Sequence, residues 1–164
     1  MICPNCRKEV PDEANFCKYC GVKLVKDAEL PPRDIIRNIV IRRIEGIRKR
    51  DPKAIESLVD PANYTKFDDW PPFYLQESEA LENEAKALRV LKEYDYEIRG
   101  WKIQVFGDFA VAAFMIRYRG LIRNLKFNVE SRVSVFLSKA GGEWRIIHEH
   151  WSRIPKIKSE SESS

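Results

Sequence analysis

Hydrophobic residues in the first half of the chain recur every three to four positions, which is the spacing of one face of an α-helix. This pattern predicts a long helix over residues 33–50 and another over residues 77–94. Asp51 and Pro52 suit the N-cap and the first position of a short helix that follows the first one. The predicted apolar faces consist of Ile36, Val40, Ile44 and Ile47 in the first helix, and of Leu81, Ala85, Leu88 and Leu91 in the other.

After residue 94 the hydrophobic period changes from about 3.6 to about 2, which is typical of β-strands. Four strand-like runs cover residues 94–106, 108–120, 126–139 and 143–154, and residues 64–67 form a shorter one. Short turns between consecutive runs predict antiparallel pairing. Helices that precede such a meander indicate an α+β fold, in which a curved antiparallel sheet wraps around the N-terminal helices as a cone with an internal cavity.

All the cysteines of the chain lie near its start, where Cys3, Cys6, Cys17 and Cys20 form two C-x-x-C pairs separated by ten residues. Each pair can supply two corners of a tetrahedral zinc site, so two pairs predict one structural Zn²⁺ with no open position. Residues 1–24 are too few to fold by burial alone, and metal binding supplies about 10 kcal/mol in small zinc peptides. Two disulfides or a redox dithiol fit less well, because cytosolic thiols stay reduced and no strand–helix unit accompanies the pairs.

The pattern divides the 164 residues into a zinc ribbon (1–24), a linker (25–32), a cone domain (33–155) and a disordered tail (156–164). The formal net charge is +4, and one zinc bound by four thiolates would bring it to about +2. A charge this mild does not indicate a nucleic-acid binder. The chain has neither an apolar run of about 20 residues nor a signal peptide, so we expect a cytoplasmic protein without a membrane partner.

The stretches "CPNC", "PDEANFCKYCG" and Lys23-Leu24 resemble the short zinc-ribbon module at the termini of many prokaryotic proteins. Arg7 departs from that module, whose first knuckle usually ends in Gly because the backbone turns there with a positive φ, so we expect modest strain at Arg7. Such ribbons mediate contacts with proteins or nucleic acid. The resemblance therefore implies that the ribbon docks a partner, and we expect a protein.

A second resemblance covers residues 33–155 and concerns the nuclear transport factor two-like superfamily, which includes SnoaL-like proteins and ketosteroid isomerases. The similarity is greatest to the association domain of calcium/calmodulin-dependent protein kinase II. It is carried by Ile116-Arg117, by Glu130-Ser131-Arg132-Val133, and by Trp144 with His148, His150 and Ser152. The resemblance implies that Arg117 and Arg132 line a ligand pocket in the cone, and Glu130, two residues before Arg132, lies on the same strand face and could neutralise it.

The residues themselves leave alternatives open. Arg117 and Arg132 are also compatible with an internally paired position on the solvent face or at an oligomer interface. His148 and His150 share one face of the last strand, where they could line the pocket, supply two metal ligands, or hold the strand end by hydrogen bonds. No third metal ligand is indicated by the sequence.

Three functions follow from these observations. The first is a non-catalytic domain that forms a homodimer or larger homo-oligomer through the outer face of its sheet and binds a small polar or anionic ligand. The second is a SnoaL-like or ketosteroid-isomerase-like enzyme, for which Asp95, Tyr64, Tyr94 and Tyr96 are the available acids, although its catalytic residues stay unknown. The third, less favoured, is a nucleic-acid-associated factor acting through the ribbon and the basic helix 33–50.

Overall fold

The computed structural model describes residues 1–24 and 30–156. The ribbon is followed by α1 (Pro32–Lys49), α2 (Pro52–Glu56), β1 (Thr65–Phe67), α3 (Glu79–Val90), β2 (Leu91–Phe106), β3 (Phe109–Ile122), β4 (Leu125–Ala140) and β5 (Glu143–Arg153). This order confirms the α+β class. No helix in the described ranges is long and apolar enough to cross a membrane.

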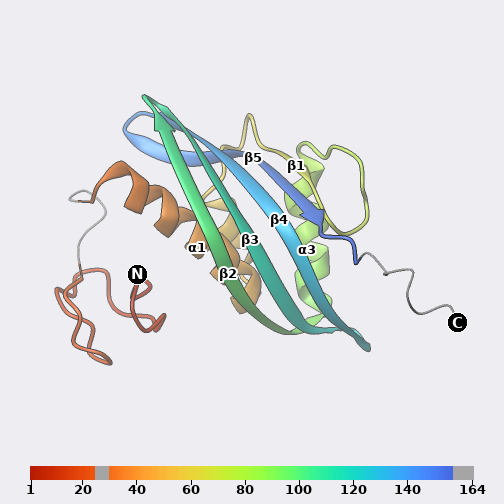
Figure 1. The fold of residues 1–164 in the computed structure, drawn as a ribbon, viewed down its shortest axis with the longest axis horizontal. Coiled ribbons are helices and arrows are strands. Elements are labelled where there is room, and N and C mark those ends of the chain that lie inside the picture. Colours follow the sequence, from red (N-terminus) through yellow and green to blue (C-terminus); the bar gives the residue numbers. More distant parts are fainter. Residues whose placement is uncertain (25–29, 157–164) are drawn as a thin grey trace, which may run out of the picture.

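The five strands form one sheet in the order β1-β5-β4-β3-β2. Strands β2 to β5 make an antiparallel meander, but β1 pairs with β5 in parallel, so the sheet is mixed rather than wholly antiparallel as predicted. Figure 1 shows the curved sheet with the helices behind it and the ribbon beyond α1. We refer to the helix-covered side of the sheet as the inner face and to the opposite side as the outer face.

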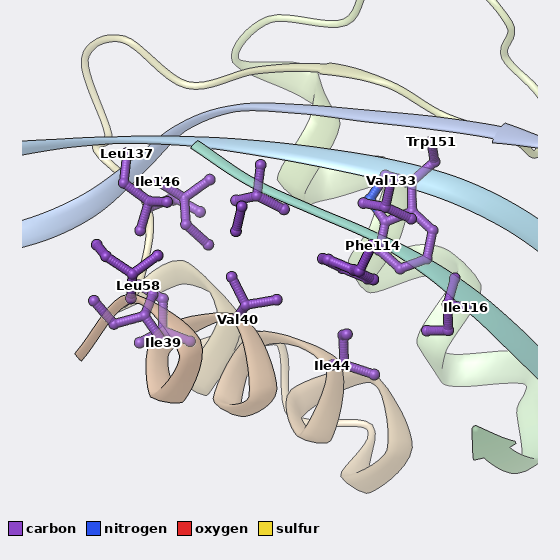
Figure 2. Packing of buried hydrophobic residues seen from close by; sticks show 14 of the residues in the cluster. Ile39, Val40, Ile44, Leu58, Phe114, Ile116, Val133, Leu137, Ile146 and Trp151 are labelled. Carbon is purple, nitrogen blue, oxygen red and sulfur yellow. The ribbon is translucent and has the colours of Figure 1, made fainter. Parts of the chain in front are cut away.

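The hydrophobic core lies between α1 and the inner face (Figure 2). Ile36, Val40 and Ile44, predicted to share one helical face, are at most 1% exposed. They pack within the same cluster as Phe114 of β3 and Ile146 of β5. The apolar face of α1 and the inward-facing residues of the strands therefore form one core, which holds the helix inside the cone.

The sheet curves where its pairing is irregular. The β2–β3 register shifts between Arg99 and Lys102, next to Gly100 with φ 68°, and the β4–β5 register shifts between Phe136 and Leu137. Such bulges bend a strand and increase its twist. At Gly120, an added Cβ would lie 1.9 Å from the carbonyl oxygen of Glu93, so β2 and β3 can approach this closely only around a glycine.

Two predicted boundaries shift. The helix expected over 77–94 ends at Val90, because Leu91 adopts an extended backbone and opens β2 by pairing with Ile122. The tertiary pairing overrides the helical pattern at this point. Of the predicted linker (25–32), residues 25–29 lie outside the described residues, and α1 begins with Pro32 at its first turn. Of the predicted tail (156–164), residues 157–164 also lie outside them.

Candidate functional site

The four cysteines converge on one point, with their sulfur atoms all within 4.8 Å of one another. The Sγ atoms of Cys3 and Cys20 are 3.6 Å apart, and those of Cys6 and Cys17 are also 3.6 Å apart. In a tetrahedral site with Zn–S bonds of about 2.3 Å, neighbouring sulfurs lie roughly 3.8 Å apart. The donor set and its spacing therefore fit one metal ion with a closed coordination shell.

Two equivalent turns position these thiols. The backbone N–H of Arg7 donates to Cys3 O, and that of Gly21 donates to Cys17 O. Both residues have positive φ, 58° at Arg7 and 71° at Gly21, which confirms the unusual backbone expected at Arg7. Hydrogen bonds from the Val22 backbone and the Asn5 side chain lower the pKa of Cys20 to about 6, which favours the thiolate that binds metal.

The interior of the cone contains a buried ionic network centred on Arg43 of α1. Its Nη2 atom donates to Glu84 of α3 at 2.7 Å and to Glu149 of β5 at 2.9 Å, and Tyr64 Oη donates to Glu149 at 2.6 Å. Arg43 is 1% exposed and Glu149 is fully buried. Although burial opposes the charge of Arg43, Glu149 and Glu84 raise its pKa, so the guanidinium stays charged.

The network continues through Lys66 of β1 and the segment that follows this strand. The Nζ atom of Lys66 lies 2.7 Å from Asp68, and this cation outweighs burial and lowers the pKa of that carboxyl. The adjacent Asp69 behaves in the opposite way, because its burial raises its pKa. Its Oδ2 accepts hydrogen bonds from Tyr118 Oη at 2.6 Å and Ser131 Oγ at 2.5 Å, which offset the burial only in part. The pKa values of these two adjacent carboxyls are therefore shifted in opposite directions.

Aromatic side chains contact Tyr118, one of the hydrogen-bond donors to Asp69. Trp70 Nε1 donates to Tyr118 Oη at 2.8 Å, and Tyr94 stacks on Tyr118 with ring centroids 5.6 Å apart. Tyr94 and Phe127 in turn line a surface hollow of about 580 Å³ between β2, β3 and β4. Asp69 itself is 5% exposed and is not among the residues that line this hollow.

The five predicted pocket residues lie on the outer face. Arg117 of β3 is opposite Glu130 of β4, with Arg117 Nη2 and Glu130 Oε2 3.5 Å apart, and Glu130 also pairs with Arg99. Arg132 is exposed, and its neighbours in sequence, Ser131 and Val133, are the ones that face the core. That these residues bind a ligand stays a prediction, but its place shifts from the interior of the cone to the outer face.

The two histidines reach the outer face because of the bulge in β5. Ile146 is buried, and strict alternation would turn His148 and His150 inward with it. The register shift inserts Ile147, which reverses the phase and turns Glu149 inward instead. The Nδ1 atom of His148 lies 2.7 Å from Thr65 Oγ1, a hydrogen bond between β5 and β1.

The acids considered for an isomerase-like site are divided between the two faces. Asp95 is 65% exposed on the outer face and pairs with Arg119 at 2.9 Å. Tyr64 and Tyr96 are buried on the other side of the sheet, where Tyr96 Oη donates to Glu45 at 2.7 Å. This arrangement separates Asp95 from the tyrosines.

Comparison with known proteins assigns both parts of the chain. A zinc-ribbon domain model matches residues 2–24, and a SnoaL-like domain model matches residues 36–156. The chain belongs to the SnoaL-like family. No curated protein matches the sequence.

Solved structures similar to this SnoaL-like protein share its fold at low identity. A nuclear transport factor 2-like superfamily protein from Salmonella enterica has 20% identity and a TM-score of 0.67, over 80% of this chain and 96% of that one. The association domain of C. elegans CaMKII has 21% identity and a TM-score of 0.63, over 77% and 99%. A candidate dehydratase from Streptomyces avermitilis has 13% identity and a TM-score of 0.68, over 76% and 96%.

The interior residues of this SnoaL-like protein were missed by the sequence reasoning. Arg43 lies among the basic residues of the first helix, and Glu149 lies between the two histidines that were predicted as site residues. One signal for Arg43 was available, because it directly precedes Ile44 on the border of the apolar stripe. Asp69 carried no periodic signal, since it lies in the loop between β1 and α3.

Proposed function

We propose that this protein is a non-catalytic, self-associating binding domain whose N-terminal ribbon, held by one structural zinc, contacts a protein partner in the cytoplasm. The proposal rests on one observation: no helix covers the outer face of the sheet. A sheet stabilises a fold by burying its faces, and this sheet has a second face with a block of side chains suited to burial.

That block, here named the outer-face patch, consists of two adjacent rows that cross four strands. The rows are Val111, Phe136, His148 and Thr65, followed by Ala113, Ser134, His150 and Phe67. The ring of Phe67 lies 5.2 Å from that of His150, and the ring of Phe136 lies 5.7 Å from that of His148, so the side chains form one surface. Asp, Glu, Lys and Arg are absent from all eight positions.

Charged residues border the patch, and several of them form ion pairs within the chain. Arg99 and Arg117 pair with Glu130, and Arg119 pairs with Asp95. An interface with an uncharged centre and a charged rim has the usual anatomy of a protein–protein contact. In this arrangement Arg117, Arg132 and Glu130 belong to the rim of the interface, and His148 and His150 to its centre.

The outer face is large enough for a stable dimer. Strands β2, β3 and β4 have 16, 14 and 16 residues. Strand β5 adds 11 residues. With strands about 4.8 Å apart and about 3.3 Å per residue, the outer face of these four strands measures roughly 900 Å². A standard interface buries about 800 Å² per partner, and a two-fold axis lets one patch pair with itself. Association domains and hubs among the similar structures support self-association as the function of such a fold.

The proposal is tested by the mass of the protein in solution. We expect sedimentation or light scattering to give at least twice the chain mass of 19.2 kDa. Phe136→Asp introduces a charge at the centre of the patch and is expected to give monomers. Leu125→Asp is the matched control, because Leu125 is 58% exposed at the start of β4, outside the patch, and this variant should stay associated. A wild-type monomer at high concentration would refute the proposal.

The ribbon also exposes side chains suited to a partner. Phe16 is 62% exposed and Tyr19 is 51% exposed, and the ammonium groups of Lys8 and Lys18 lie 4.6 and 5.0 Å from the centre of the Tyr19 ring. Because the two lysine ammonium groups already lie against the tyrosine ring, this ring is poorly placed to stack on nucleic-acid bases. An acidic protein surface complements this cluster better.

The basic helix supports nucleic-acid binding less than its composition suggests. Arg43 is buried, Arg48 pairs with Glu45, and Arg50 donates to backbone carbonyl groups of the helix–strand junction at residues 91–92. Cations that are already paired contribute little to a free electrostatic surface.

A second candidate function is acid–base catalysis at Asp69, in agreement with the candidate dehydratase among the similar structures. One observation favours it: adjacent carboxyls at positions 68 and 69 have pKa values shifted in opposite directions, and hydroxyls of Tyr118 and Ser131 bind Asp69. The burial of Asp69 ranks it second, because a carboxyl that is 5% exposed is hardly accessible to a substrate.

A further inference from the structure

The ribbon touches the cone along the seam between α1 and β2. The guanidinium of Arg7 lies 5.7 Å from the centre of the Tyr96 ring of β2. The Oε2 atom of Glu9 lies 3.1 Å from the ammonium of Lys49 at the end of α1. Both ribbon residues lie just after Cys6, at the end of the first knuckle, so one short segment makes both contacts.

The backbone conformation of Arg7 favours a functional role for this contact. In the second knuckle Gly21 occupies the equivalent position, with φ 71° and nothing within 4 Å of an added Cβ. Arg7 adopts the same left-handed conformation, at φ 58°, although a residue with a side chain is disfavoured there and glycine is not. The chain therefore tolerates strain at one knuckle and avoids it at the other, and the strained residue is the one that reaches the cone.

The contact depends on the metal. The ribbon has a core of four buried residues, two of which are the cysteines Cys3 and Cys17, so without metal it lacks the buried area to fold. The knuckle that directs Arg7 and Glu9 to the same side would then be lost. A hollow of about 640 Å³ lies between the ribbon and residues of α1 and β2, so the docked surfaces are not closely packed throughout.

We infer that Arg7 is a latch that couples zinc binding in the ribbon to docking on the Tyr96–Lys49 seam of the cone. Zinc occupancy closes the ribbon over the seam, and loss of zinc releases it. Coupling of this kind is reciprocal, so the cone residues Tyr96 and Lys49, which are not metal ligands, raise the zinc affinity of the ribbon. This inference rests on the metal binding proposed above, but not on self-association.

The test measures zinc affinity of the full chain by competition with a chromogenic chelator. Tyr96→Leu removes the ring and is expected to lower zinc affinity roughly 2- to 5-fold, the lower range for a cation–π contact, because the Arg7 cation is exposed. Tyr96→Phe keeps the ring and is the matched control, with wild-type affinity expected. In an Arg7→Gly background, Tyr96→Leu should have no effect on zinc affinity, because the latch is already absent.

Lys49→Ala provides a second measurement that does not depend on a buried residue, since Lys49 is exposed. We expect a loss of zinc affinity of up to about 5-fold, and no further loss when Glu9 is also replaced by Ala. Equal zinc affinities for the wild type, Tyr96→Leu and Lys49→Ala would overturn the latch, as would a loss that is the same with Arg7 and with Gly at position 7. A chain that binds no zinc at all would instead refute the metal site on which the latch depends.

Discussion

Replacing Arg43 by methionine is the sharpest single perturbation of the cone. Methionine has similar length and keeps the helix, but it removes the cation that lies 2.9 Å from Glu149. Glu149 is fully buried, and the hydroxyl of Tyr64 remains its one charge-stabilising contact in the described network. The substitution therefore leaves a carboxylate in the core without a counter-ion.

The expected cost is about 3–5 kcal/mol in the free energy of unfolding, the range for breaking a buried ion pair by removing one partner. Two features place Arg43→Met within that range. Glu149 Oε1 already has no hydrogen-bond partner among the described residues, and Glu84, the other partner of Arg43, is only 11% exposed. At roughly 2–4 °C per kcal/mol for a chain of this size, the melting temperature should fall by about 6–20 °C.

Urea unfolding followed by circular dichroism measures this effect, and a double-mutant cycle isolates its cause. Arg43→Met combined with Glu149→Gln removes both charges and should be at least about 1 kcal/mol more stable than Arg43→Met alone. Arg119→Met is the matched control, because Arg119 and Asp95 are 69% and 65% exposed, and it should cost less than about 1 kcal/mol. If Arg43→Met costs no more than this control, or if the double variant is no more stable than the single one, the assignment of a buried ionic network is wrong.

Three further outcomes follow from the same structure. Chelation of zinc should abolish amide-exchange protection in residues 1–24 while the cone stays protected, and persistent ribbon protection would contradict a metal-dependent fold. Burial and the charge of His150 lower the pKa of His148, so the neutral form is favoured in the folded state and stability should decline as pH falls below 6.5. His148→Gln should reduce this decline when the free energy of unfolding is measured with urea at several pH values. An unchanged pH dependence would count against this role of His148. Burial raises the pKa of Asp69 above 3.8, so its contribution to stability is lost as pH rises through its folded-state pKa, and Asp69→Asn should remove this loss. If the stability of Asp69→Asn and that of the wild type depend on pH in the same way, this prediction is wrong.

The parts of the fold that depend on local spacing could be predicted from the sequence. The stripe of Ile36, Val40 and Ile44 is a property of one helix, and it packs inward as its period requires. Asp51 caps α2 as expected, since its side chain accepts from the Ala54 N–H at 3.0 Å. The four cysteines also meet, because the two pairs are close in sequence and each turn is fixed by a short hydrogen bond.

The candidate site could not be predicted in the same way, because its members come from separate elements. Arg43, Glu84 and Glu149 lie on α1, α3 and β5, and no spacing along the chain relates them. The sequence by itself determined the order of the helices and strands and the meeting of the four cysteines, since these depend on periodicity and on neighbouring positions, but not the end of α3 at Val90. Only the tertiary structure decided that one extra residue in β5, Ile147, turns both histidines outward and Glu149 inward, because the phase of a strand is set by the register with its neighbours.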